Sequence, residues 1–319
     1  MGRYHADAIR RAGATVAAIV DVRAEPRNEL ARRFSAGSHD TLARALERGA
    51  DVVHICTPLS SHFALCREAL DRGAHVVVEK PATPTGGEAA ELVEHARAAR
   101  RYLVPVHQFS FQPGVMRLLA ELPRLGRILH VEFATSSAGA ETGFTGNPDE
   151  HRDAVAAEIT PHALALFRRF TALDTAELDW RLHRPAAGEW RFSSSTGGIS
   201  LQGFISLAGR PTFIGCRIIA ERGTGHADLA HGFSIIEPGA SSRNYKIVRP
   251  LLLGTRTAAA AAINMAGRVA RREGAYPGLR HLIAGVYGAI QSPDTPPPVS
   301  FEELLDVARA RDRLIQLAR

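Results

Sequence analysis

The first 124 residues alternate between two periods of hydrophobic positions. Short runs of consecutive apolar residues predict strands buried on both faces, and stretches with apolar residues three and four apart predict helices. The predicted strands cover residues 15–20, 51–56, 75–78 and 103–107, and the predicted helices cover 3–12, 25–34, 40–48, 60–71, 86–101 and 113–122. This alternation is typical of a doubly wound parallel sheet with helices on both faces.

The pattern changes after residue 124 and becomes rich in strands. Strands are predicted at residues 128–136, 178–183, 190–195, 199–207, 212–220 and 245–248, and helices at 153–170, 257–272, 279–290 and 301–317. Consecutive strands joined by short turns predict a mostly antiparallel sheet. We therefore expect an α/β domain over residues 1–124, followed by an α+β domain over residues 125–319.

Composition narrows the class of protein. Of the 319 residues 45% are hydrophobic and 23% are charged, which excludes a disordered or collagen-like chain. The sequence lacks an apolar run long enough for a membrane span, a secretory signal and a compact basic cluster, so we expect a cytoplasmic protein that binds neither membrane nor nucleic acid. The three cysteines are too few and too scattered for a disulfide framework, and no cluster of residues has the spacing of a metal site.

Polar or turn residues follow each predicted strand of the first domain. They are Asp21, Thr57 with Pro58, Glu79 with Lys80, and Gln108 after His107. Ligands of parallel sheets bind beyond the carboxyl ends of the strands, so four such ends predict a binding site there.

The beginning of the chain resembles the interior of a dinucleotide-binding unit. That unit opens with a strand and a G-x-G-x-x-G turn, and an acidic residue that binds ribose follows about 20 residues later. Asp21 lies 19 residues after Gly2, so Gly2 fits the third glycine, and we expect the first strand and the first two glycines to be absent from this sequence. The alternative is that Gly2 is simply a flexible second residue.

Four segments together resemble the Gfo/Idh/MocA oxidoreductases, named after glucose-fructose oxidoreductase, inositol dehydrogenase and a rhizopine catabolism protein. They are the helix start GRYHADAIRRAG, the strand end at Asp21, ICTPLSSH at residues 55–62, and VVEKP at residues 77–81. The resemblance implies a Rossmann-type domain that binds a nicotinamide cofactor. It also implies a second domain whose open sheet face commonly forms dimers or tetramers.

Each strand end then has an expected role toward the cofactor. Asp21 would accept hydrogen bonds from the adenosine ribose and repel a 2′-phosphate, which favours NAD. Arg23 is equally placed to pair with a 2′-phosphate, so NADP stays open. Thr57 and Pro58 would let the backbone approach the nicotinamide half, and His62 either touches the cofactor or faces solvent. Glu79 and Gln108 are the remaining residues that we expect to contact the cofactor.

Catalysis is expected from Lys80, His162 and Glu158. The ammonium of Lys80 would stabilise a developing alkoxide, and the resemblance implies a cis Lys80–Pro81 bond. His162 would act as the acid or base, and Glu158, four residues earlier on the same helix face, would orient it.

Two segments depart from the family pattern. Asp153, Ala154 and Val155 replace glycines of the motif that carries the family's catalytic histidine, and Ser110 replaces an arginine. These changes are expected to reshape the substrate pocket.

The sequence therefore predicts an NAD(P)-dependent dehydrogenase. It would transfer a hydride between nicotinamide and a secondary alcohol or ketone carbon of a sugar, nucleotide sugar or cyclic polyol, and would work as a homodimer or homotetramer. The alternative is a catalytically retired member of the same fold that binds a nucleotide or sugar as a regulator or scaffold. A chain that truly starts at Met1 would lack the phosphate-binding loop, which would favour this alternative.

Overall fold

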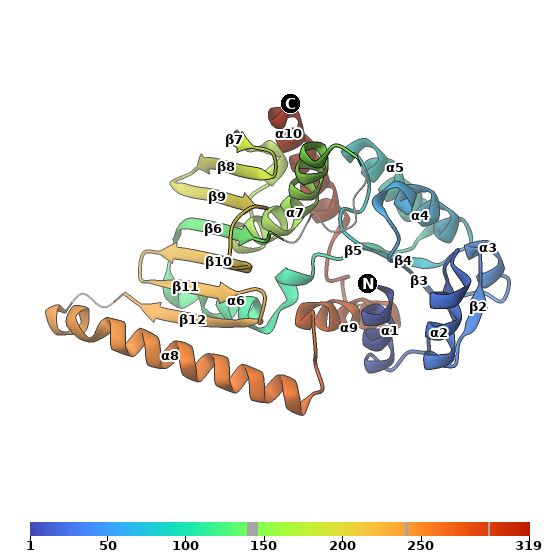
Figure 1. Ribbon diagram of the computed structural model, residues 1–319, viewed down its shortest axis with the longest axis horizontal. Helices are drawn as coiled ribbons and strands as arrows, with labels where there is room; N and C mark the ends of the chain where they lie inside the picture. The colour runs from blue at the N-terminus through green and yellow to red at the C-terminus, as the bar shows by residue number, and fades with distance from the viewer. Residues whose placement is uncertain (139–145, 240–241, 293) are drawn as a thin grey trace. The chain divides into compact units, whose positions relative to one another are not determined.

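The computed structural model describes residues 1–138, 146–239, 242–292 and 294–319. The chain divides into two compact units (Figure 1). The first comprises residues 1–107 and 279–309, and the second comprises residues 108–278 and 310–319. Among the described residues no helix is long and apolar enough to cross a membrane.

The first unit contains the parallel strands that the sequence predicts. Its elements are α1 (Gly2–Arg11), β1 (Ala18–Val20), α2 (Ala24–Phe34), β2 (Gly37–His39), α3 (Leu42–Ala45), β3 (Val52–Ile55), η1 (Leu59–Ser61), α4 (His62–Asp71), β4 (His75–Val78), α5 (Gly86–Ala99), β5 (Leu103–Pro105), α9 (Pro277–Gln291) and the first part of α10 (Phe301–Ala318).

The parallel strands of this unit fall into two groups. β1 pairs with β2, and β3, β4 and β5 form a separate three-stranded sheet. No strand of the described chain joins β1 to β3. The core of the three-stranded part is made by Val76 and Val78 of β4 with Leu92 of α5 and Leu70 of α4, all buried.

The second unit is built around a seven-stranded sheet. Its elements are η2 (Gln108–Phe111), α6 (Pro113–Leu125), β6 (Ile128–Ser136), α7 (Pro148–Thr171), η3 (Thr175–Glu177), β7 (Arg181–Ala186), β8 (Glu189–Thr196), β9 (Ile199–Ser206), β10 (Phe213–Ala220), β11 (Gly223–Asp228), β12 (Phe233–Pro238) and α8 (Arg243–Ala270). The strand order is β12-β11-β10-β6-β9-β8-β7, and only the β6–β9 pair is parallel. The prediction of a mostly antiparallel sheet is confirmed.

One face of this sheet is covered and the other is open. α6 packs against β11 and β12, and α7 packs against β6, β8 and β9. Phe133 of β6 is buried under these helices, whereas Glu132, Gln202 and Arg217 lie side by side in register on the opposite face and are not buried. α6 belongs with this sheet because Gln112 donates to the carbonyl of Leu229 at 2.7 Å, and the second unit accordingly begins at Gln108 rather than at residue 125.

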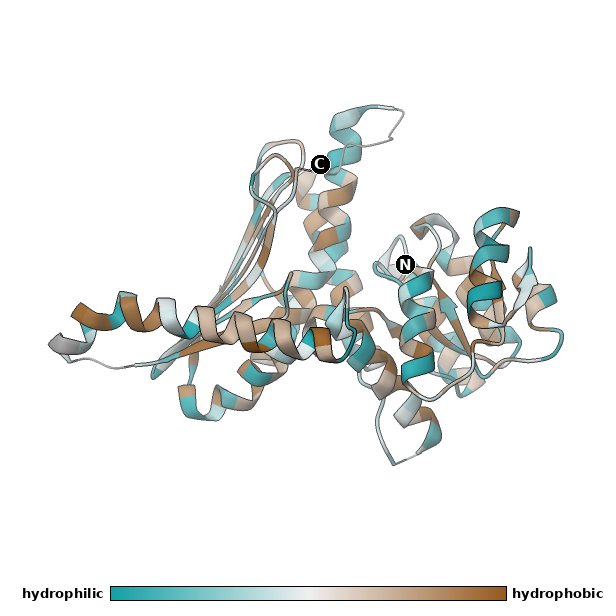
Figure 2. Ribbon diagram, turned by 60° about the horizontal axis from the view of Figure 1, so that its bottom comes forward, coloured by the Kyte–Doolittle hydropathy of each residue, from teal (hydrophilic) through white to brown (hydrophobic). Residues whose placement is uncertain are grey.

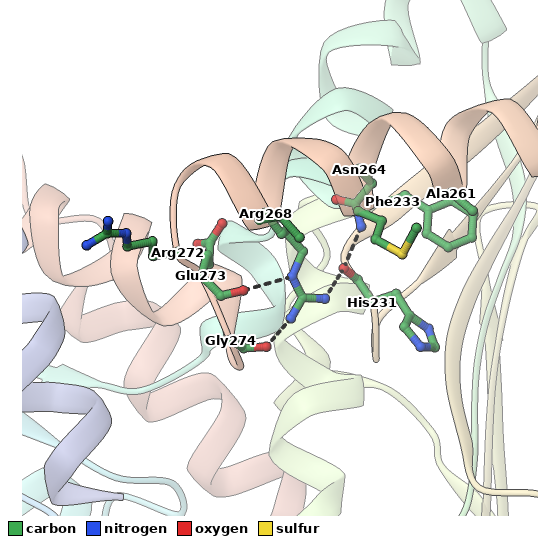
Figure 3. A pocket seen from close by; sticks show the side chains of 10 residues that line it. His231, Phe233, Ala261, Asn264, Arg268, Arg272, Glu273 and Gly274 are labelled. Carbon is green, nitrogen blue, oxygen red and sulfur yellow. Dashed lines mark hydrogen bonds between the residues drawn. The ribbon is translucent and has the colours of Figure 1, made fainter.

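The structure differs from the predicted elements at several places. Residues 245–248, predicted as a strand, lie inside α8, which begins at Arg243 rather than at residue 257. The sequence pattern does not predict β2, β11 or β12, and α7 begins at Pro148 rather than at residue 153. The end of α8 is anchored on the turn before β12, where Arg268 and Asn264 both donate to the carbonyl of His231 at 3.0 Å (Figure 3).

A glycine controls the packing between β8 and β9. A Cβ atom at Gly203 would lie 2.1 Å from Cζ of Phe192, its partner across the ladder. We predict that Gly203→Ala lowers the free energy of unfolding by about 1–3 kcal/mol, because the ring must move within a packed core. Urea unfolding measures this. Gly274→Ala, where a Cβ meets nothing within 4 Å, is the matched control, and equal losses in the two variants would contradict the prediction.

Candidate active site

Asp21 directly follows β1, and local hydrogen bonds hold its carboxylate. Oδ1 accepts the backbone N–H of Arg23 at 2.8 Å and lies 3.4 Å from Nε of the same arginine. The backbone hydrogen bond is the main cause that lowers the pKa of Asp21, and the Arg23 guanidinium adds to it. About a third of the Asp21 side chain is exposed (32%), so an ionised acceptor is presented at this strand end.

Glu79 and Lys80 follow β4, as the sequence predicts. Glu79 is buried, and its Oε2 accepts the backbone N–H of Lys80 at 3.3 Å. The Lys80–Pro81 peptide bond is cis, as the resemblance implies. The carboxylate thus fixes the backbone from which the Lys80 side chain projects.

The other oxygen of Glu79 begins a chain of hydrogen bonds that the sequence analysis missed. Oε1 lies 3.0 Å from Nε2 of His5 on α1, and Nδ1 of His5 lies 2.9 Å from Nδ1 of His54 on β3. Nε2 of His54 lies 3.2 Å from the hydroxyl of Tyr287 on α9. Four titratable side chains from four elements of the first unit are therefore connected in a row.

The hydrogen-bond roles are fixed at one end of this row. A carboxylate only accepts, so Nε2 of His5 donates to Glu79, whereas the roles of the other ring nitrogens depend on the tautomers of His5 and His54. Burial keeps the pKa of His54 well below its ordinary value and raises the pKa of Tyr287 to about 12, so both side chains are neutral at pH 7.

His62 and Thr57 tie two strand ends together. The His62 ring is buried, with Nδ1 2.8 Å from the carbonyl of Pro81 and Nε2 2.9 Å from the carbonyl of Thr57. His62 therefore does not face solvent, which removes one of the two alternatives for it. Thr57 and Pro58 themselves are exposed at the end of β3.

Gly2 is the first residue of α1. A Cβ atom there would meet only Cδ2 of Leu30, at 4.0 Å, which is ordinary contact. The described packing therefore does not by itself require glycine at this position.

In the second unit His162 lies on α7 beside η2. The His162 ring is buried, and its centroid is 4.3 Å from that of Phe109. Two buried polar atoms of η2 have no hydrogen-bond partner among the described residues, namely Oε1 of Gln108 and Oγ of Ser110. Buried polar atoms are almost always satisfied in native proteins, so water or a polar ligand has room to bind these two.

Glu158 lies on α7 with His162. It also interacts electrostatically with Arg311, a residue distant in sequence. Arg311 of α10 is buried, and its Nε donates to the carbonyl of Ala157 at 3.2 Å. Burial lowers the pKa of Arg311, and the negative charges of Asp312 and Glu158 oppose this shift. Glu158 therefore lies in the field of a buried cation that no sequence pattern had indicated.

Asp153, which stands in place of a motif glycine, has a structural role. Its Oδ1 accepts the Trp190 indole N–H at 2.9 Å and the Gly188 N–H at 3.0 Å, and its Oδ2 pairs with Arg184 at 2.8 Å. The carboxylate ties α7 to the β7–β8 hairpin. Among the residues that the structure describes, no group of three His, Cys, Asp or Glu side chains could hold a metal ion.

Comparisons with known proteins show what the chain is similar to. Residues 1–107 match the Gfo/Idh/MocA family model, described as an oxidoreductase family with an NAD-binding Rossmann fold. The chain is 33% identical over 156 residues to inositol 2-dehydrogenase 4 of Saccharopolyspora erythraea, covering 46% of this chain and 45% of that protein. It is 31% identical over 118 residues to UDP-N-acetylglucosamine 3-dehydrogenase of Acidithiobacillus ferrooxidans, covering 37% of each. The chain thus matches less than half the length of these relatives.

Solved structures extend the likeness in fold to the whole chain. The WlbA dehydrogenase from Bordetella pertussis, in complex with NADH and UDP-GlcNAcA, superposes with a TM-score of 0.75 at 16% identity, covering 100% of this chain and 92% of that one. The Acidithiobacillus enzyme superposes with a TM-score of 0.72 at 20% identity, covering 99% and 92%. Both units therefore have the fold of such dehydrogenases.

The buried histidine pair predicts how stability depends on pH. The pKa of His54 is lower in the folded than in the unfolded chain, so the unfolded chain takes up an extra proton as pH falls below about 6.5. Stability should fall in that window, by at most about 1.4 kcal/mol per pH unit for this group. His54→Gln should flatten the slope, whereas His183→Gln on the exposed part of β7 should not. Urea unfolding at several pH values measures this, and identical slopes in wild type and His54→Gln would contradict it.

Proposed function

Since its first 107 residues match the family model, the chain belongs to the Gfo/Idh/MocA family of oxidoreductases, and we propose that it is an NAD(P)-dependent dehydrogenase. Its substrate would be the secondary alcohol or ketone carbon of a sugar, a nucleotide sugar or a cyclic polyol. The observation that carries this proposal is the match over residues 1–107, because that segment contains both Asp21 and the Glu79–Lys80 pair. Inositol and UDP-N-acetylglucosamine dehydrogenases among the relatives support this substrate class.

The chain's own residues fit a nicotinamide cofactor. Asp21 offers an ionised acceptor for ribose hydroxyls, and the buried, unsatisfied amide oxygen of Gln108 offers a further polar contact. When bound, the cofactor supplies the hydride chemistry. Gly2, Arg23, Thr57, Pro58, His62 and Glu79 remain proposed contacts on the strength of the resemblance.

Three side chains would take part in the reaction at the substrate carbon. The Lys80 ammonium would stabilise negative charge on the substrate oxygen, as a preorganised cation does. His162 would take the hydroxyl proton during oxidation and return it during reduction. Glu158 would act through His162 as a positioning residue, with the buried Arg311 cation near its carboxylate.

The roles of His162 and Lys80 can be separated by kinetics. His162→Ala should lower kcat by about 10²–10⁴-fold, the usual contribution of general acid–base catalysis, with little change in cofactor affinity. Lys80→Ala should lower kcat and weaken binding together. Turnover is followed by NADH fluorescence with myo-inositol, UDP-N-acetylglucosamine and related polyols, with His183→Ala as the control. If His162→Ala kept near-full turnover, the assignment of the base would fail, and if no substrate reacted with either cofactor, the regulator alternative would replace the dehydrogenase.

The choice of cofactor depends on the charge at Asp21. Because the pKa of Asp21 is lowered, the carboxylate is ionised at neutral pH and repels a 2′-phosphate. Asp21→Asn should raise the affinity for NADP relative to NAD by about 10- to 100-fold, the value of one hydrogen bond to a charged group. Calorimetric titration with both nucleotides measures the ratio. Asp40→Asn, which removes an exposed carboxylate paired with Arg44, should leave it unchanged. An unaltered ratio in Asp21→Asn would exclude Asp21 from cofactor selection.

A further inference from the structure

α8 is a long helix that leaves most of its side chains exposed. It runs over 28 residues, which is about 42 Å, yet none of its described side chains is buried. Its large apolar side chains are strongly exposed: 71% for Ile247, 72% for Leu251, 73% for Ile263, 66% for Met265 and 72% for Val269. Figure 2 shows the hydrophobic turns along the helix. Apolar patches of this size on a soluble protein mark an interaction site.

Most of these residues form one narrow stripe along the helix. At 3.6 residues per turn, seven positions between residues 247 and 269 fall within an arc of about 80°. They are Ile247, Leu251, Gly254, Ala258, Ala262, Met265 and Val269, and all seven are exposed. The stripe contains no charged residue, and at its carboxyl end Met265 and Val269 border the pocket that α8 forms with Phe233 of its own domain.

The stripe has the same pattern when it is read in either direction from Ala258. Gly254 and Ala262 lie four residues on either side, Leu251 and Met265 seven residues, and Ile247 and Val269 eleven residues. Small residues thus occupy the middle of the stripe, and large apolar residues occupy both ends at equal distances.

We propose that the α8 stripe binds the α8 stripe of a second copy of this chain, antiparallel, with a two-fold axis at Ala258. A two-fold interface uses the same patch on both subunits and requires that patch to be self-complementary. Antiparallel pairing about Ala258 places Leu251 opposite Met265 of the partner subunit and Ile247 opposite Val269 of the partner subunit. This surface is independent of the proposed reaction.

The sizes of the side chains fit that arrangement. Gly254, Ala258 and Ala262 are spaced by four residues, and small residues at this spacing let two helices approach closely where they cross. A Cβ atom at Gly254 would meet nothing within 4 Å in the single chain, so the space beside the crossing point is open. The larger side chains at both ends of the stripe then contact the partner helix, where the two helix axes lie further apart.

The charges of α8 lie outside the stripe. α8 carries no acidic residue, Arg249 is bound to Glu237 at 2.7 Å, Arg268 donates to backbone carbonyls, and Arg256 is exposed. The choice of a second copy over an anionic membrane therefore rests on the symmetry and the side-chain sizes of the stripe, and vesicle binding tests the membrane.

Cysteine cross-linking tests the register directly. Ala258→Cys should form a disulfide-linked dimer on mild oxidation, because the two-fold axis brings position 258 next to its own copy. Ala259→Cys, one residue further along and turned away from the stripe, should not. Leu251→Cys and Met265→Cys should each form no disulfide-linked dimer alone but should cross-link when the two variants are mixed. Native Cys66 and Cys216 are buried and Cys56 is partly buried, which keeps the background low.

A charge at the axis tests the energetics. Ala258→Glu should weaken this self-association by about 100-fold or more, since two like charges would meet, whereas Ala259→Glu should leave it nearly unchanged. Mixing Ala258→Glu with Ala258→Lys should restore it, because the pair at the axis then has opposite charges. Sedimentation velocity over a range of protein concentrations measures the self-association of each variant.

The proposal is overturned by any of three results. The first is a wild-type chain that stays monomeric at tens of micromolar, a concentration at which weak dimers form (Kd of about 10⁻⁵ M). The second is equal cross-linking at positions 258 and 259. The third is an oligomer that Ala258→Glu does not change, which would place self-association on another surface. Monomeric protein that binds anionic phospholipid vesicles through α8 would likewise replace the second copy with a membrane.

Discussion

The buried carboxylate of Glu79 imposes the strictest constraint in the first unit. A buried carboxylate needs hydrogen-bond donors, and this one has two, the backbone N–H of Lys80 and the ring of His5. The first fixes the backbone of the proposed catalytic lysine, and the second holds the ring of His5. His54 and Tyr287 extend the same row of hydrogen bonds, which therefore connects α1, β3, the end of β4 and α9.

The sequence could predict those parts of the site that depend on strand ends, and it missed those that depend on distant partners. Asp21 and Lys80 follow apolar runs, and this local pattern places them. His5 meets Glu79 across 74 residues, and His54 meets Tyr287 across 233, so no window of sequence contains both members of a pair. Arg311 reaches the backbone of α7 across 154 residues in the same way. The proposed roles of His162 and Glu158 came from a family resemblance and stay predictions.

The errors in the fold have equally specific causes. β11 contains Gly223 and Gly225, which lower strand propensity, but a Cβ at either position would lie 2.7 Å from Leu125 or Leu118 of α6, so close packing selects glycine there. Residues 245–248 contain β-branched side chains that favour a strand, yet Ser242 caps a helix by accepting the Tyr245 N–H at 3.2 Å. The cap and the alanine-rich continuation outweigh four residues of local preference.

The two long helices of the second unit differ in where their apolar side chains lie. Those of α7 are buried within the chain, whereas large apolar side chains of α8 are exposed. α7 buries Phe167, Leu164 and Ala163 against the sheet, and its exposed side carries charges such as Arg168 and Glu150. α8 reverses this order, since Arg268 and Arg249 contact its own domain while Leu251 and Val269 face outward. The apolar side chains of a helix stabilise a structure only when another surface buries them away from water. The contacts of α8 with β12 therefore account for where the helix lies, and only a partner on its outer face accounts for which residues it carries there.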